Sequence, residues 1–184
     1  RERIKLNGVF VEKEFIFSFV NEHINLIKEL KPSYFELSVA MAFSYFKYKE
    51  VDMAIIEVGL GGRLDSTNII NPLLSLITNI SLDHTQTLGN SLAEIAYEKA
   101  GIIKKQVPVV IGEKQIETSR VFERTAKERS APLFYAEEMN HESLLPGVSQ
   151  EIFEEGPFFN KNLISALGAI RVFQQYYPQW SLTR

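Results

Sequence analysis

Residues 53–68 read Met53-Ala-Ile-Ile-Glu-Val-Gly-Leu-Gly-Gly-Arg-Leu-Asp-Ser-Thr-Asn68. The stretch begins as an apolar run and, from Glu57 onward, supplies an acid, glycines, an arginine, an aspartate and an amide. A buried strand that ends on an acid and opens into a glycine-rich turn is typical of the carboxyl edge of an open α/β sheet, where ligands bind. The stretch therefore predicts a strand over 52–58 and a ligand-binding loop directly after it.

The rest of the chain alternates short apolar runs with longer amphipathic stretches, which indicates α/β architecture with a mostly parallel sheet flanked by helices. Lys31-Pro32 ends one helix, and Ser33 with Glu36 predicts a capping box that begins the next. The expected strands lie at 8–11, 52–58, 73–80, 107–111 and 132–135. The expected helices lie at 19–30, 33–48, 91–103, 114–129 and 162–177, with an acidic, loop-rich crossing at 137–158.

The composition narrows the class of protein. With 184 residues, 45% hydrophobic and 23% charged, the chain is long enough for one domain with a sizeable core. A net charge of -3 argues against a broad nucleic-acid footprint, and no apolar run is long enough to cross a membrane. The absence of cysteine excludes disulfides, thiolate nucleophiles and zinc-thiolate sites, and a cytoplasmic location fits. Because residue 1 is Arg, we expect the chain to begin downstream of its gene's start.

Glu57 is the first candidate for chemistry. A carboxylate at a strand end suits a hard cation such as Mg²⁺, but it also suits an ion pair with Arg63 or a helix N-terminus. The nearby Gly59, Gly61 and Gly62 allow a backbone with positive φ or a close approach to a ligand, and they equally allow a simple tight turn.

Asp65, Ser66 and Asn68 place acceptors and donors on the same short loop. Such a cluster could orient a heteroaromatic or amide-bearing ligand. The alternative is local, because Asp and Ser cap turns and Asn tolerates left-handed geometry.

Asp83 and His84 follow the next expected strand. Neighbouring parallel strands would bring Glu57 and His84 to one edge of the sheet, where a carboxylate and a neutral imidazole could share a metal ion. Asp83 would orient the imidazole or cap a turn.

Lys99 lies in the helix after His84, between Glu98 and Ala100. Apolar neighbours reduce the solvation of a lysine and lower its pKa toward reactivity. The alternative is that Glu98 and Lys99 belong to a solvated helix face.

The chain resembles the folylpolyglutamate synthase/dihydrofolate synthase group of the Mur ligase superfamily. The resemblance rests on residues 57–68, on Asp83-His84 followed by Leu88-Gly89, and on Ile95-Ala-Tyr-Glu-Lys-Ala-Gly-Ile102. Residues 33–36 also resemble the family's segment before the helix leading into the first motif. The order and spacing of these strings match over about residues 33–172, and the match is weakest through 114–158.

The resemblance implies an ATP-dependent ligase that joins L-glutamate to dihydropteroate or to folylpolyglutamates through an acyl phosphate. It implies catalytic roles for Glu57, His84 and Lys99, with Glu57 and His84 binding Mg²⁺ and Lys99 carbamylated. It also implies residues that contact the pterin substrate and the adenine end of ATP. The substrate residues are Arg63, Asp65, Ser66 and Asn68, and the ATP residue is Asn162.

Two departures from the family pattern limit what the chain does alone. The phosphate-binding string Gly-x-x-x-x-Gly-Lys-Ser/Thr is missing, and the family's smaller C-terminal domain is expected after residue 184. We therefore expect residues 1–184 to be part of a central ATP-binding domain that lacks its P-loop strand and helix, and to be inactive alone. The parent is expected to be a cytoplasmic monomer. Alternatives are another Mur-type amide ligase or a non-catalytic α/β binding module.

Overall fold

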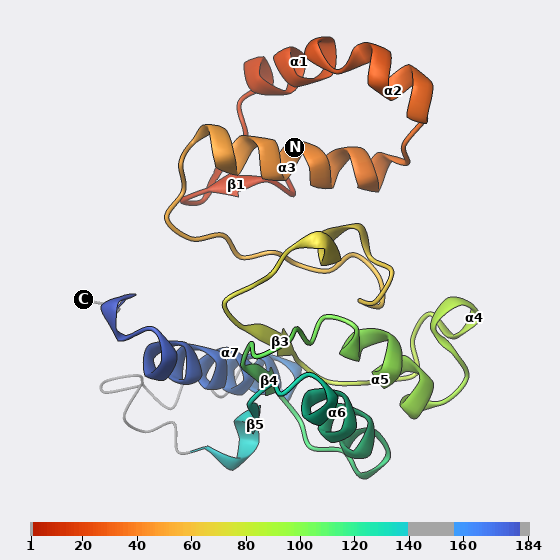
Figure 1. Ribbon diagram of the computed structural model, residues 1–184, viewed down its shortest axis with the longest axis vertical. Helices are drawn as coiled ribbons and strands as arrows, with labels where there is room; N and C mark the ends of the chain where they lie inside the picture. The colour runs from red at the N-terminus through yellow and green to blue at the C-terminus, as the bar shows by residue number, and fades with distance from the viewer. Residues whose placement is uncertain (1, 140–156, 181–184) are drawn as a thin grey trace. The chain divides into compact units, whose positions relative to one another are not determined.

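The computed structural model describes residues 2–139 and 157–180. The chain divides into two compact units, Arg1–Gly59 and Leu60–Arg184, and each has its own hydrophobic core (Figure 1). Over the described ranges, no helix combines the length and the apolar character that crossing a membrane requires.

The first unit is a small hairpin followed by helices. Its turn residues Asn7 and Gly8 both have positive φ, 49° and 83°, as a two-residue hairpin turn of type I′ requires. The core of the unit includes the fully buried Val11 and Tyr45. Its elements are β1 (Lys5–Leu6), β2 (Val9–Phe10), α1 (Lys13–Glu22), α2 (Ile24–Leu30) and α3 (Tyr34–Tyr48).

The capping box predicted for α3 is confirmed. The Ser33 hydroxyl accepts a hydrogen bond from the Glu36 backbone N–H at 3.2 Å, and the Glu36 carboxylate accepts one from the Ser33 backbone N–H at 2.7 Å. The single helix predicted over 19–30 is wrong, because α1 ends at Glu22 and α2 begins at Ile24. At the break, the His23 ring lies 2.9 Å from the Phe19 carbonyl oxygen.

The strand predicted over 52–58 is also wrong. A strand requires a hydrogen-bonded neighbour, and within the described ranges no ladder joins this segment to another strand. The apolar run therefore remains extended loop, with Ile55 93% exposed.

The second unit is built around a parallel sheet, as predicted. The strands are β3 (Ser75–Ile77), β4 (Val109–Ile111) and β5 (Leu133–Tyr135), in the order β3-β4-β5. Their register aligns Ile77 with Ile111 and Ile111 with Tyr135. The central strand β4 is buried along its whole length, which is the pattern of a parallel strand covered on both faces.

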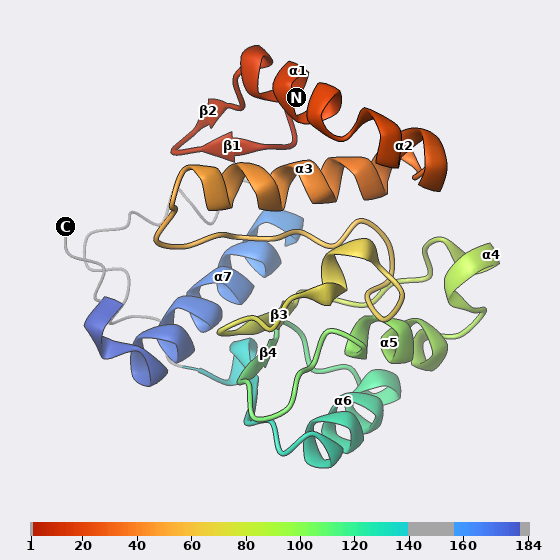
Figure 2. The same cartoon turned by 45° about the horizontal axis from the view of Figure 1, so that its top comes forward.

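Helices cover both faces of this sheet (Figure 1, Figure 2). On one face, Val109 and Ile111 share a core with residues of α5 and α6, including Ile95 and Phe122. On the other face, Val110 shares a smaller core with Val172 of α7. The helices are α4 (Thr85–Leu88), α5 (Leu92–Ala100), α6 (Ile116–Glu128) and α7 (Pro157–Tyr176), with 3-10 turns η1 (Ser66–Ile69), η2 (Ala136–Glu138) and η5 (Pro178–Trp180).

The helices predicted after 91, 114 and 162 correspond to α5, α6 and α7, although α7 already begins at Pro157. Most of the predicted loop-rich crossing lies outside the described residues.

Candidate functional site

His84 lies beyond the carboxyl end of β3, in a turn that begins α4. Its backbone is left-handed, with φ 51° and ψ 37°, a conformation that costs free energy for a residue with a side chain and is found often at functional sites. The His84 backbone N–H donates to Asp83 Oδ1 at 2.8 Å, and His84 Nε2 lies 3.7 Å from Asp83 Oδ2. Both side chains are exposed, so the imidazole is accessible to a ligand and has a carboxylate beside it.

Glu57 is exposed and belongs to the first unit, whereas His84 belongs to the second. Their shared metal site therefore stays a prediction. Within residues 2–139 and 157–180, no group of three or more His, Asp or Glu side chains is arranged to hold a metal ion.

The glycine loop lies against the C-terminal end of α5. Gly61 has φ 67°, and a Cβ on Gly62 would lie 2.9 Å from the Glu98 carbonyl oxygen. From the helix side, a Cβ on Gly101 would lie 2.3 Å from Arg63 Cα. The two backbones approach so closely that these positions need glycine, and this contact links the two motifs that are separate in the sequence.

Asp65 stabilises the loop from within. Its Oδ1 accepts hydrogen bonds from the Thr67 backbone N–H at 2.9 Å and from the Thr67 hydroxyl at 2.5 Å. Its Oδ2 accepts a hydrogen bond from the Leu60 backbone N–H at 2.9 Å. The carboxylate therefore caps η1, which is the local alternative considered for this residue.

Asn68 joins the loop to α5. Its side-chain amide donates to the backbone oxygens of Arg63 at 3.2 Å and Gly101 at 3.1 Å. The Asn68 carbonyl oxygen accepts a hydrogen bond from Lys104 Nζ at 2.7 Å. Burial lowers the pKa of Lys104, and the nearby Arg129 lowers it further.

Arg63 pairs with Glu98 rather than with Glu57. Its Nη2 lies 3.0 Å from Glu98 Oε1, and its Nε lies 3.2 Å from Glu98 Oε2. The guanidinium also lies over the Tyr97 ring, 5.6 Å from the ring centroid. The Arg63 backbone N–H donates a hydrogen bond to the Glu98 carbonyl oxygen at 2.8 Å. Arg63 therefore contacts Glu98 of α5 through both its side chain and its backbone.

Lys99 follows Glu98 and is half-buried. Its carbonyl oxygen accepts a hydrogen bond from the Ile102 backbone N–H at 3.2 Å. Over the described part of the chain, its ammonium group makes no hydrogen bond or ion pair. The loop contacts at Glu98 and Gly101 thus fix the backbone of Lys99 from both sides. Its side chain takes part in none of these contacts.

The remaining predicted residues lie on separate elements of the second unit. Ser66 begins η1 and is partly buried, and Asn162 is an exposed residue of α7. Neither is brought next to Lys99 or His84 by a described side-chain contact.

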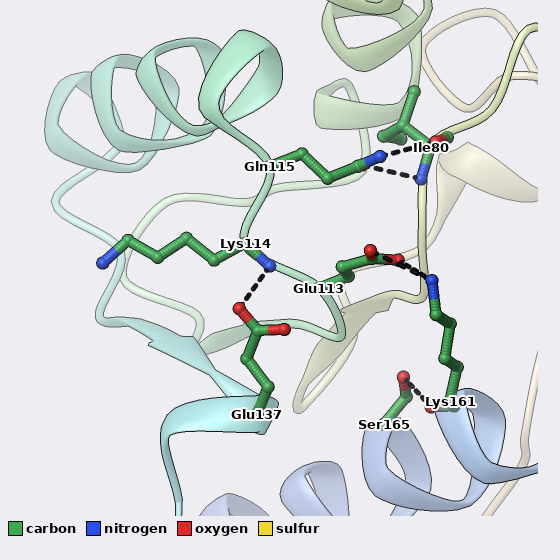
Figure 3. Close-up of polar contacts among 7 residues, drawn as sticks. All are labelled: Ile80, Glu113, Lys114, Gln115, Glu137, Lys161 and Ser165. Atoms are coloured by element: carbon green, nitrogen blue, oxygen red, sulfur yellow. Dashed lines mark hydrogen bonds and ion pairs between the residues drawn. The ribbon is translucent and has the colours of Figure 1, made fainter. Parts of the chain in front are cut away.

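A polar network after β4 was not predicted from the sequence (Figure 3). Glu113 pairs with Lys161 of α7 at 2.9 Å, and the Lys114 backbone N–H donates to Glu137 at 2.9 Å. Gln115 bonds both backbone groups of Ile80, with its Oε1 3.1 Å from the nitrogen and its Nε2 2.9 Å from the oxygen. The sequence feature that could have predicted this network is the polar string Gly112-Glu-Lys-Gln115. It directly follows a buried strand, at the carboxyl edge of the sheet where ligands bind.

The second unit thus presents two sets of candidate groups, the loop bound to the end of α5 and the turn after β3. The family model described as Mur ligase middle domain matches residues 12–162. A dihydrofolate synthase/folylpolyglutamate synthase from Bacillus subtilis is 43% identical over an alignment of 138 residues, and the match covers 71% of this chain and 32% of that protein. The chain thus spans about a third of the length of this curated relative.

Two solved structures are similar over most of the chain. An FPGS-AMPPCP-folate complex has a TM-score of 0.76 at 28% identity, covering 90% of this chain and 45% of that one. An E. coli FolC in complex with DHPP and ADP has a TM-score of 0.68 at 34% identity, covering 73% of this chain and 32% of that one.

Proposed function

The chain belongs to the family of the Mur ligase middle domain, and from that membership we propose that it forms part of an ATP-dependent ligase that adds L-glutamate to dihydropteroate, folylpolyglutamates or both. In this reaction a substrate carboxylate oxygen attacks the γ-phosphorus of ATP, which forms an acyl phosphate and releases ADP. The amino group of glutamate attacks the acyl carbon, loses a proton and expels phosphate. The product is an amide.

The ligands of similar proteins support this substrate class. The Bacillus subtilis relative is named for both synthase reactions. One solved neighbour holds AMPPCP and folate, and another holds DHPP and ADP. A nucleotide and a pterin compound are therefore the proposed small-molecule ligands of this family member, with L-glutamate as the third substrate.

The observation that carries the proposal is the attachment of residues 60–68 to the end of α5. Arg63 and Asn68 bind Glu98 and Gly101, the residues on either side of the Lys99–Ala100 pair. The loop proposed to lie at the pterin and the lysine proposed to act in catalysis are therefore held as one piece. This is the kind of fixed geometry that positioning of reactants requires.

Lys99 is proposed to carry a carbamate. Its ammonium group would first lose a proton, and the free amine would then attack the carbon of CO₂ and lose a second proton. A cation is thereby converted into an anionic carbamate, which can donate oxygen ligands. A partly buried lysine whose ammonium group makes no described ion pair suits this change, because no existing salt bridge is lost. Asn162 of α7 is proposed to contact the adenine end of ATP, on the strength of the family resemblance.

Glu57 and His84 are proposed to hold Mg²⁺. Both side chains are exposed. The Glu57 carboxylate is the oxygen donor that Mg²⁺ prefers, and the His84 imidazole is assigned to the same ion on the strength of the family resemblance. The carboxylate of Asp83 beside the His84 ring is the kind of neighbour that orients a ligating histidine. When bound, the ion would offset negative charge on the transferring phosphoryl group.

The test uses the full-length protein with ATP, Mg²⁺ and L-glutamate. We expect ADP release and a new amide product, identified by mass spectrometry, when dihydropteroate or a reduced folate is added. Supplying each pterin substrate separately shows which of the two reactions occurs. If neither pterin substrate raises the rate of ATP turnover but another carboxylate substrate does, the protein is a different Mur-type ligase. Absence of ATP and pterin binding by calorimetry would instead favour a non-catalytic module.

We further propose that the full-length protein is a cytoplasmic monomer that acts on these small molecules without nucleic-acid or membrane partners. The net charge of -3 is compatible with this. Size-exclusion chromatography with light scattering tests the monomer.

A further inference from the structure

Gln115 lies between β4 and α6, and its side chain bonds a residue outside the helix that it precedes. It occupies the N-cap of α6, yet its amide makes no capping hydrogen bond to that helix. Instead, Oε1 accepts a hydrogen bond from the Ile80 backbone N–H and Nε2 donates one to the Ile80 carbonyl oxygen, at 3.1 and 2.9 Å (Figure 3). One side-chain amide thereby binds both backbone groups of a single residue.

This contact continues the pairing of β3 with β4. Beyond the strand ends, the Gly112 backbone N–H donates to the Ile77 carbonyl at 2.8 Å, and the Glu113 N–H donates to the Thr78 carbonyl at 3.1 Å. The chain after Lys114 then enters α6, so backbone pairing stops. The Gln115 amide supplies the next donor and acceptor in place of a peptide group.

Gln115 is itself held firmly. The Ser119 backbone N–H and hydroxyl donate to the Gln115 carbonyl oxygen at 2.9 and 2.7 Å. The preceding residues are anchored by Glu113 to Lys161 and by the Lys114 N–H to Glu137. The amide thus projects from a segment with fixed contacts on both sides.

The residue it binds marks a change from core to surface. Ile80 is 3% exposed and belongs to the core shared with α5 and α6. Residues 81–84 are exposed and lead to the left-handed His84. The hydrogen bonds within this turn are local, from the Asp83 N–H to Ser81 and from the His84 N–H to Asp83. On the α4 side the His84 carbonyl oxygen accepts hydrogen bonds from the Thr87 and Leu88 backbone N–H groups, and on the β3 side the turn is attached to the sheet through Ile80.

We propose that Gln115 is a positioning residue that fixes the turn carrying His84 at the carboxyl edge of the sheet. This rests on the proposed function, in which His84 is a metal ligand. Gln115 touches neither metal nor substrate; it acts through Ile80.

The decisive variant is Gln115→Glu in the full-length protein. It has nearly the same shape and keeps an acceptor for the Ile80 N–H, but it places a carboxylate oxygen against the Ile80 carbonyl where a donor stood. Gln115→Leu, which removes both bonds without adding a charge, serves as a second variant if the first fails to fold. Gln175→Glu is the matched control, since Gln175 is exposed on α7.

The first measurement is hydrogen exchange of peptides covering 78–88, which does not depend on activity. We expect faster exchange there in the Gln115 variants and no change in the control. The second is the Mg²⁺ dependence of ligation, where the activation constant should rise roughly tenfold or more while kcat at saturating Mg²⁺ changes by less than about threefold.

Unchanged exchange over 78–88 would overturn the proposal, as would faster exchange with an unchanged Mg²⁺ activation constant, because the contact would then serve stability alone. If the wild-type protein does not ligate glutamate, the proposed function fails separately. Mg²⁺ binding by calorimetry, compared between wild type and Gln115→Glu, then decides whether Gln115 positions a metal ligand.

Discussion

At the scale of single residues, the side chains of the glycine loop bond to the protein itself. Asp65 caps η1, Asn68 binds the Gly101 carbonyl and Arg63 binds Glu98. The sequence could predict the capping alternative for Asp65, because its partner Thr67 is two residues away. It could not predict the partner of Asn68, since Gly101 lies 33 residues further along the chain. Contacts of that range depend on the tertiary fold.

Replacing Asn68 with Asp tests whether this side chain is chiefly structural. The new carboxylate would face the Arg63 and Gly101 carbonyl oxygens without a donor, so we expect the free energy of unfolding to fall by about 1–3 kcal/mol. Urea denaturation measures the loss, and Asn71→Asp, at an exposed asparagine outside the loop, is the control. Unchanged stability together with a raised KM for the pterin substrate would show instead that Asn68 acts mainly through the substrate.

Glu57 and His84 are predicted to act together on the metal. In the full-length protein, Glu57→Gln and His84→Asn should each raise the Mg²⁺ activation constant by at least about tenfold, because each removes a proposed ligand. If both contact one ion, the double variant should lose much less than the product of the single effects. Asp52→Asn, at an exposed carboxylate in the segment before Glu57, should change little. Independent, multiplicative effects would contradict a shared ion.

At the scale of elements, the strand predictions that succeeded are those whose segments have a partner strand and covering helices. Strands β3, β4 and β5 fall within apolar runs predicted as strands, and neighbouring strands and helices supply the hydrogen bonds and cover that such runs need. The run at 52–58 has the same local character but no described ladder partner. Local pattern gives the tendency to extend, whereas pairing is a property of two segments. The helix predicted at 33–48 matches α3 because Ser33 and Glu36 mark its start within the local sequence.

The ends of α1 and α3 are joined by an ion pair that should make the first unit sensitive to acid. Lys49 Nζ lies 2.8 Å from Glu12 Oε1, and hydrogen bonds from Lys49 and then Tyr45 lower the pKa of Glu12 to about 2. Because this pKa is depressed in the folded state, the stabilisation is complete above the ordinary pKa of 4.5 and is lost as the pH falls toward 2. Above pH 4.5, Glu12→Gln should therefore be less stable than wild type.

Urea denaturation of wild type and Glu12→Gln across this pH range measures the effect. The difference in unfolding free energy between the two proteins should shrink steadily as the pH falls from 4.5 to 2. Glu14→Gln, at an exposed glutamate of the same helix, should follow the wild-type curve. A constant difference between wild type and Glu12→Gln at all pH values would show that the Glu12 charge is not responsible.

At the scale of the whole molecule, the chain comprises two units with separate cores. The α/β class and the parallel sheet were predictable, because they follow from apolar runs and amphipathic stretches that alternate along the second unit. The division near residue 59 was not, since residues 57–68 appear in the sequence as one continuous motif. Glu57 was expected near His84 because both would follow neighbouring parallel strands, but Glu57 does not end a strand in the described residues. Their pairing now depends on the family relationship and on the metal experiment.

The 184-residue polypeptide alone is predicted not to ligate glutamate. It spans 32% of its Bacillus subtilis relative, and its sequence contains no Gly-x-x-x-x-Gly-Lys-Ser/Thr string to surround the ATP phosphates. Phosphoryl transfer depends almost wholly on positioning and on charge stabilisation around those phosphates, so a site without such donors should leave the acyl phosphate unformed. Product analysis by mass spectrometry, with the full-length protein as positive control, checks this. A cooperative unfolding transition must first show that the polypeptide is folded. Ligation that requires both ATP and glutamate by residues 1–184 would contradict the prediction and would place the phosphate-binding groups within the two units described above.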